Sequence, residues 1–251
     1  MNRNPLGKED IANMIKKILS FALILSLAIC AFALAEAAVI EPIVGRIIEM
    51  QPDGFRLEPL NGGGEVNVMT DDNTENAAAW TVGKGDVVTV TYDGNMTRSM
   101  PPQITAQAIH AQSVVGEVDE LDRSGNRILV ETKGMGDIWF TLPEGVNAHD
   151  LDDRNVRVYF SGAVAMSFPA QAAAQAVDLI RTIDGDVVSV ADDHFVIRDD
   201  GRETRINIDL HTQLNRPIEV RDDVDVYYLS ESLNAQTGEI YASVVIADYD
   251  D

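Results

Sequence analysis

The chain has 251 residues, of which 19 are Lys or Arg and 41 are Asp or Glu, so its formal net charge is −22. Such an acidic surface repels phosphate groups, which basic side chains must neutralise before nucleic acid can bind, and we therefore predict no nucleic-acid partner. Cys30 is the only cysteine. Apolar cores must therefore hold the rest of the chain together, without disulfides or thiolate metal sites.

The first 35 residues are typical of a signal peptide. Lys16-Lys17 precede the apolar run Ile18–Ala33, and Ala33-Leu34-Ala35 is a small-x-small cleavage site. The apolar run is shorter than the ~20 residues that span a bilayer, although an uncleaved anchor is the alternative. We predict an exported protein, periplasmic or extracellular, with no membrane association after cleavage. Translation starts at Met1 or at Met14.

The remainder of the chain consists of three related units of about 70 residues, because several landmarks recur in constant register. A glycine near the start of each unit, a valine in a later strand and an alanine near the end all align. They are Gly45, Gly116 and Gly185; Val90, Val158 and Val226; Ala106, Ala174 and Ala242. We place the units at residues 39–111, 112–181 and 182–248.

In the first unit, apolar alternation and turn residues predict five short strands. They are Ile43–Met50, Phe55–Pro59, Glu65–Met69, Asp86–Tyr92 and Ile104–His110. The longer segment after the third strand has alanines that follow polar cap residues, which favours a short helix at Thr74–Trp80.

The second and third units repeat this order of strands. The expected strands are Val115–Leu121, Arg127–Thr132, Gly136–Thr141, Val156–Phe160 and Ala172–Ile180, then Ile183–Val190, His194–Arg198, Glu203–Ile208, Val224–Leu229 and Glu239–Ala247. Five strands with an insertion after the third match an OB-type barrel, which closes a small sheet that would otherwise expose two edges. We predict an all-β chain of three tandem five-stranded OB-like barrels after a signal peptide. An SH3-like barrel or a three-part β-sandwich is the alternative.

Two segments carry a resemblance to a known group of domains. Gly85-Asp86-Val87-Val88-Thr89-Val90 and Gly238-Glu239-Ile240-Tyr241-Ala242-Ser243-Val244-Val245 resemble small exported bacterial OB-like β-barrel domains of unknown function. The middle unit departs from the pattern, with Asn155-Val156-Arg157-Val158 in place of Gly-Asp. The resemblance implies the fold and no catalytic residue.

The sequence contains no recognisable catalytic or metal-binding motif. Its four histidines lack the spacing of metal ligands, and no nucleophile stands in a known motif with a base; the histidines are His110, His149, His194 and His211. We therefore predict that the chain is not an enzyme and has no catalytic residue, cofactor or metal site.

Four residues are candidates for ligand contact. Trp80 and Trp139 can each pack in a core or offer a stacking surface. Met100 and Met166 belong to the repeated phrases SMPPQITAQAI and SFPAQAAAQAV, where flexible methionines beside proline can adapt to a partner. Both phrases align with GEIYASVVIA in the third unit, which indicates the closing strand of each barrel.

These observations predict an exported, non-enzymatic binding or scaffolding protein with a protein, peptide or glycan partner. The alternative is an acidic, cation-responsive cell-envelope protein, because the abundant carboxylates could bind divalent cations loosely.

Overall fold

The structure is a computed structural model that describes residues 40–248 except 79, 123 and 134. The chain divides into Met1–Glu41 and Pro42–Asp251, and the description below concerns the second unit. The predicted signal peptide lies outside the described residues. Among the described residues, the structure has no helix with the length and apolar character needed to cross a bilayer.

The first barrel is built from five strands, and a closed circuit of pairings joins them. The strands are β1 (Ile43–Gln51), β2 (Gly54–Pro59), β3 (Val66–Met69), β5 (Val87–Tyr92) and β6 (Gln103–His110). Strand β1 pairs with β2, β2 with β3, β5 with β6 and β1 with β5, all antiparallel, and the parallel pair β3–β6 closes the barrel. This is the layout expected of an OB-like fold.

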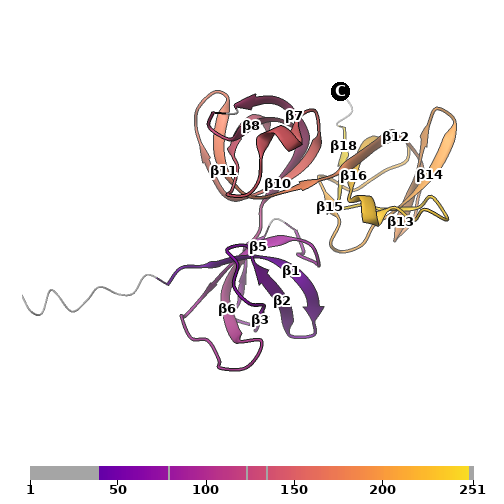
Figure 1. The fold of residues 1–251 in the computed structure, drawn as a ribbon. Coiled ribbons are helices and arrows are strands. Elements are labelled where there is room, and N and C mark those ends of the chain that lie inside the picture. The colour runs from indigo at the N-terminus through magenta and orange to yellow at the C-terminus, as the bar shows by residue number, and fades with distance from the viewer. Residues whose placement is uncertain (1–39, 79, 123, 134, 249–251) are drawn as a thin grey trace, which may run out of the picture. The chain divides into compact units, whose positions relative to one another are not determined.

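The second barrel repeats this circuit (Figure 1). Its strands are β7 (Ser113–Asp122), β8 (Arg127–Thr132), β9 (Gly136–Thr141), β10 (Asn155–Ala165) and β11 (Ala170–Leu179), with the 3-10 helix η1 (Ala148–Leu151) before β10. The parallel pair β9–β11 closes it. The alanine-rich run of β11 is therefore a strand, as predicted from its alignment with the third unit.

The third barrel follows the same order with an interrupted last strand. Its elements are β12 (Arg181–Val190), β13 (His194–Asp199), β14 (Arg202–Asn207), β15 (Gln213–Leu214), β16 (Asp223–Tyr228), η2 (Ser230–Ser232), β17 (Ile240–Tyr241) and β18 (Val244–Ala247). Strand β17 pairs with β14 and β18 pairs with β16, so the two pieces together occupy the place of β6. The predicted fold class, three tandem OB-like barrels, is confirmed.

Glycine recurs at the aligned position of each barrel for a steric reason. A Cβ atom on Gly45, Gly116 or Gly185 would lie 2.6, 2.1 or 2.8 Å from a carbonyl oxygen of the facing second strand. Three residues after each glycine, the register of the first strand shifts, between Ile47 and Glu49 in the first barrel and at the same place in the other two. Such bulges bend a strand, and bending allows a five-stranded sheet to close.

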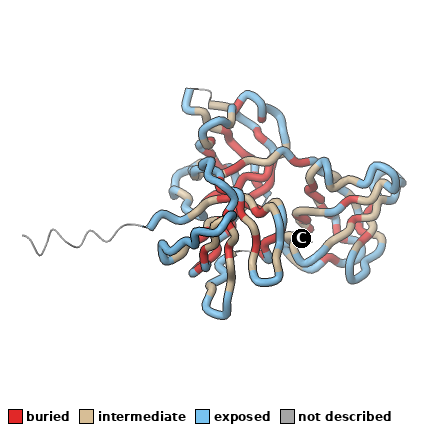
Figure 2. The backbone as a smooth tube through the Cα atoms, turned by 60° about the horizontal axis from the view of Figure 1, so that its bottom comes forward, coloured by how far each residue is buried: buried red, intermediate tan, exposed pale blue. Residues whose placement is uncertain are grey.

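Each barrel has its own apolar core, and buried residues run along the strands of each (Figure 2). Fully buried aromatic rings lie inside, such as Phe55 in the first barrel, Phe140 in the second and Phe195 in the third. Since the chain has no cysteine after Cys30, burial of these side chains supplies most of the stability.

The predicted helix at Thr74–Trp80 is wrong. Residues Glu75–Asn76 form β4, a two-residue strand that pairs in parallel with β6 at Ala108 and Ile109. The Thr74 hydroxyl donates a hydrogen bond to the carbonyl oxygen of Ala106 at 2.9 Å. This segment therefore pairs with the backbone of β6, and this tertiary pairing overrides the helical propensity of its alanines.

Candidate functional site: a buried arginine between barrels

The first half of strand β10, residues 156–160, is buried on both of its faces. Val156, Val158 and Phe160 point into the core of the second barrel, so Arg157 and Tyr159 must point outward, because side chains alternate along a strand. Both are nevertheless buried. Tyr159 belongs to the apolar core of the first barrel, so β10 contributes side chains to two barrels.

The first barrel offers a buried carboxylate to this face of β10. Asp86, directly before β5, is 6% exposed. Its Oδ2 accepts hydrogen bonds from the indole Nε1 of Trp80 and from the backbone N–H of Gly83, both at 2.9 Å. These two donors belong to the loop before β5, and they fix the side chain from within its own barrel.

The other carboxylate oxygen of Asp86 faces the second barrel. Arg157 Nη1 lies 3.2 Å from Asp86 Oδ1, and the hydroxyl of Tyr159 donates to the same oxygen at 3.5 Å. Burial raises the pKa of the Tyr159 hydroxyl well above its usual value, so it stays protonated and acts as a donor at neutral pH. A buried ion pair of this kind needs such additional hydrogen bonds to offset desolvation.

The guanidinium of Arg157 is held on three sides. Its Nε donates to Ser113 Oγ at 3.0 Å, and its Cζ lies 5.0 Å from the ring centre of Trp80 and 4.8 Å from that of Tyr159. The remaining nitrogen, Nη2, is buried without a hydrogen-bond partner among the described residues. A buried donor without a partner costs ~1–3 kcal/mol, which makes this nitrogen the exception in an otherwise satisfied cluster.

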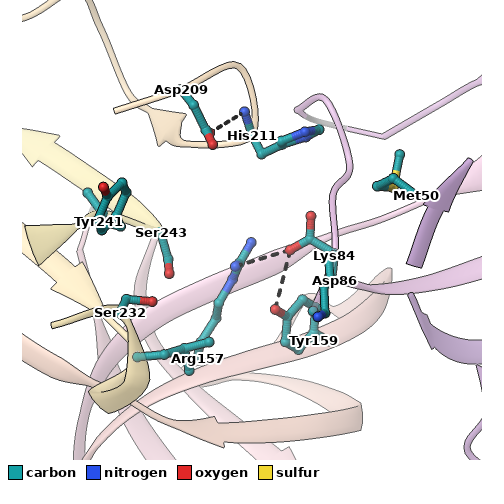
Figure 3. A pocket seen from close by; sticks show the side chains of 13 residues that line it. Met50, Lys84, Asp86, Arg157, Tyr159, Asp209, His211, Ser232, Tyr241 and Ser243 are labelled. Atoms are coloured by element: carbon teal, nitrogen blue, oxygen red, sulfur yellow. Dashed lines mark hydrogen bonds and ion pairs between the residues drawn. The ribbon is translucent and has the colours of Figure 1, made fainter. Parts of the chain in front are cut away.

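A cavity of about 290 Å³ lies against this guanidinium. Figure 3 shows Arg157 at its centre, with Ser232, Ser243 and Tyr241 on one side and Asp86 and Lys84 on the other. All three barrels line the cavity; the remaining lining residues are Met50, Gly85, Tyr159, Asp209, His211, Leu229 and Ala242. Its size is near the lower end for small-molecule sites.

Side-chain contacts tie the barrels together around this cavity. Arg46 in β1 forms two hydrogen bonds to Asp178 in β11, at 2.8 and 2.6 Å. In the third barrel, His211 Nδ1 lies 3.1 Å from the carbonyl oxygen of Thr81. Bidentate arginine–carboxylate pairs fix orientation as well as distance, so the Arg46–Asp178 pair orients the first barrel against the second.

The structure places the four candidate ligand-contact residues in different environments. Trp80 is buried, with its ring under Arg157. Trp139 is half-buried in β9 and lies under Arg127, whose Cζ is 5.1 Å from the ring centre. Met100 and Met166 are fully exposed in the loops β5–β6 and β10–β11, and neither lines the cavity. Trp80 alone therefore contacts the site.

Sequence reasoning missed Arg157, Asp86 and Tyr159. The sequence does hold a signal for Tyr159. Tyr159 and Tyr227 occupy the same position of the repeat, on the face of the fourth strand that points away from the core of its own barrel. A large aromatic residue repeated on an outward face indicates a contact between barrels.

The chain was compared with known proteins. No protein-family model and no curated protein matches it. Six solved chains match, among them the following two, which have low similarity to this chain. The first, a Drosophila chain described as Unr CSD456, has 15% identity and a TM-score of 0.19, with 84% of this chain and 99% of that chain covered. The second is a multidomain protein with nucleic acid binding domains from Streptococcus pneumoniae, with 13% identity, a TM-score of 0.19, and 80% and 72% covered.

The prediction that nucleic acid is excluded as a partner is wrong. One of the two matching structures is described as a multidomain protein with nucleic acid binding domains, and this finding contradicts the prediction. The physical reason is that net charge describes the whole chain, whereas binding depends on the local arrangement of donors and aromatic rings.

Proposed function

We propose that this chain is an exported, non-enzymatic binding protein whose ligand occupies the cavity beside Arg157. The observation that carries the proposal is the buried guanidinium with an unpartnered Nη2 facing a cavity of about 290 Å³. A ligand with an acceptor oxygen would satisfy this donor, and the free protein would then no longer bear the cost of the missing hydrogen bond.

The surroundings of Arg157 support binding rather than catalysis. The guanidinium is already fixed by Asp86 and Ser113 and held between two aromatic rings, so it is preorganised to donate. Preorganised donors raise affinity because little conformational freedom is lost on binding. Among the described residues, no group of three or more His, Cys, Asp or Glu side chains is placed so that it could hold a metal ion.

Export rests on the pattern of the first 35 residues. Expression of the full chain in a Gram-negative host, followed by fractionation and N-terminal sequencing, should give a protein outside the cytoplasm that begins at Glu36. A protein that stays in the cytoplasm with its leader intact would contradict this part of the proposal.

The binding site is tested by NMR. The mature chain is titrated with a fragment mixture of small carboxylates, amides, phosphates and saccharides, and separately with a single-stranded oligothymidylate. We expect at least one fragment to shift the amide signals of Gly85, Ser232 and Ser243, which line the cavity.

Two variants control this experiment. Ser243→Trp fills the cavity and should abolish the shifts, whereas Gln236→Trp, on an exposed loop of the same barrel, should leave them unchanged. If no fragment moves these amides, the cavity is not a binding site. If only the oligonucleotide binds, and at other residues, the chain is a nucleic-acid-binding protein and our proposal is wrong.

A further inference from the structure

We infer that the ligand presents a single carboxylate to Arg157 and carries an apolar or aromatic body. This inference rests on the proposed function and adds the chemical class of the ligand. It follows from which polar groups of the cavity are already satisfied and which are free.

Three of the four carboxylate oxygens that line the cavity already have partners in the protein. Both oxygens of Asp86 accept hydrogen bonds or ion pairs from the protein. Asp209 Oδ1 accepts from the backbone N–H groups of His211 and Thr212, at 2.8 and 3.2 Å. Asp86 therefore has no unoccupied oxygen for a ligand donor, and one of the two oxygens of the exposed Asp209 is occupied as well.

The donors, by contrast, are free. Arg157 Nη2 has no partner among the described residues, and the exposed Lys84 forms no ion pair that the structure records. The hydroxyls of Ser232 and Ser243 face the same space (Figure 3). Unused donors next to filled acceptors favour a ligand group that only accepts, and an ionised carboxylate is such a group.

The local charge fits one negative charge. Lys84 and Arg157 balance Asp86 and Asp209 in the cavity lining, while the chain as a whole carries −22. An anion in the cavity therefore meets no net repulsion from the charged residues of the lining. One free guanidinium nitrogen matches a carboxylate, whereas phosphate sites assemble several backbone or guanidinium donors.

Part of the cavity lining is apolar and exposed. Met50 is 42% exposed and Tyr241 is 56% exposed, although both line the cavity, and the half-buried Leu229 lines it as well. Exposed apolar side chains around a polar floor provide contact area for the body of a ligand, and tyrosine can stack on an aromatic ring.

The inference is tested with phenylacetate, phenylacetamide and phenyl phosphate on the mature chain. Binding is followed by isothermal titration and by the emission of Trp80 in a Trp139→Phe background, since the Trp80 ring contacts Arg157. We expect phenylacetate to bind roughly tenfold more tightly than phenylacetamide, because hydrogen bonds to an ionised acceptor are about twice as strong as neutral ones. We expect phenyl phosphate to bind more weakly than phenylacetate.

Charge variants show where the carboxylate lies. Lys84→Glu should weaken phenylacetate binding severalfold. Arg98→Glu changes the net charge equally, in an exposed loop of the same barrel that does not line the cavity, and should have little effect. Arg157→Gln removes the charge and keeps hydrogen-bond donors, so it should reduce the preference for phenylacetate over phenylacetamide. Protection of the Ile47 amide from hydrogen exchange reports whether the first barrel remains folded.

The outcomes separate this inference from the proposed function. Equal affinity for phenylacetate and phenylacetamide at the cavity would overturn the inference that the ligand presents a carboxylate. The proposal that the cavity is a binding site would still stand. Tighter binding of phenyl phosphate than of phenylacetate would mean that the ligand presents a phosphate and would overturn the inference. Binding of phenylacetate that survives Ser243→Trp would place the anion elsewhere and overturn the inference.

Discussion

The first and third barrels bury an aspartate at the same position, directly before the fourth strand. Asp86 and Asp222 are each 6% exposed. In both, Oδ2 accepts from a backbone N–H three residues earlier and from a side chain six residues earlier. These donors are Gly83 and Trp80 for the first barrel, and Glu219 and Arg216 for the third.

The two barrels differ in how the charge of the aspartate is balanced. Asp222 pairs with Arg216 of its own loop, at 2.8 Å. Asp86 has a neutral tryptophan at that place and takes its cation, Arg157, from the second barrel. The difference teaches that one position in the repeat can close a loop within a barrel or join two barrels, depending on where the cation comes from.

The largest expected effect is that of Asp86→Ala. Arg157 would stay buried without its partner, so we expect the local stability of the first barrel to fall by ~3–5 kcal/mol. The probe is hydrogen exchange of the Ile47 amide, which donates to the Asp86 carbonyl at 2.9 Å.

Asp222→Ala is the matched variant in the third barrel, read at the Val187 amide, which donates to the Asp222 carbonyl at 2.8 Å. We expect a smaller fall of ~1–3 kcal/mol, because the Arg216 side chain is 21% exposed and can be hydrated. Equal falls at the two amides would contradict the view that Asp86, unlike Asp222, balances a charge from another barrel.

Trp80→Phe has the next largest expected effect. It removes the N–H donor to Asp86 and keeps most of the ring, so we expect a loss of ~1.5–3 kcal/mol in the first barrel, as for hydrogen bonds to charged groups. Trp139→Phe is the control: the structure records no hydrogen bond from its indole, so its effect in the second barrel should stay below ~1 kcal/mol. Exchange of core amides in each barrel measures both. If both substitutions cost the same, the indole N–H of Trp80 contributes nothing specific.

Much of the fold could be predicted from the sequence, because barrel closure depends on features that repeat. Gly45, Gly116 and Gly185 are required where the facing backbone leaves no room for a Cβ, and the valines of the fourth strand fill each core. The Thr74–Trp80 segment was mispredicted because its pairing partner, β6, lies about thirty residues further along the chain. Local propensity carries no information about such a partner.

The candidate site could not be predicted, because its members come from different repeats. Asp86 and Arg157 are 71 positions apart, and their pairing depends on how two closed barrels pack. Comparison of the repeats does not reveal the site either, because the positions equivalent to Arg157 carry Thr89 and Asp225. Asp225 instead pairs with Lys133 of the second barrel at 2.9 Å, so the same position joins barrels with the opposite charge.

Acidification should affect the third barrel through Asp222. The hydrogen bond from Arg216 holds the pKa of this carboxyl below its usual value, so the unfolded chain binds the proton more readily. The stabilisation is therefore present above the unfolded pKa of about 3.9 and is lost as the pH falls through the folded value. A carboxyl-carbon NMR titration should show the Asp222 midpoint rise in Arg216→Gln. An unchanged midpoint would mean that Arg216 does not set the pKa.

The smallest expected effect concerns the residue before each buried aspartate. Gly85 and Arg221 both have positive φ, 97° and 83°, a region that L side chains adopt at a cost of ~1–2 kcal/mol. Glycine avoids this cost but loses ~0.5–1 kcal/mol through the greater freedom of the unfolded chain.

Arg221→Gly should therefore stabilise the third barrel by a net ~0.5 kcal/mol, measured by slower exchange of the Val187 amide. The Arg221 amide itself donates to the Val187 carbonyl at 2.8 Å, so the probe lies directly on the strained turn. Gly64→Ala is a useful reference, since a Cβ there would meet nothing within 4 Å and its φ is not positive; it should leave the first barrel unchanged or slightly more stable. A loss of stability in Arg221→Gly would show that contacts of the arginine side chain compensate for the strain of its backbone. The third barrel would then depend on a side-chain contact that Gly85 cannot make in the first barrel.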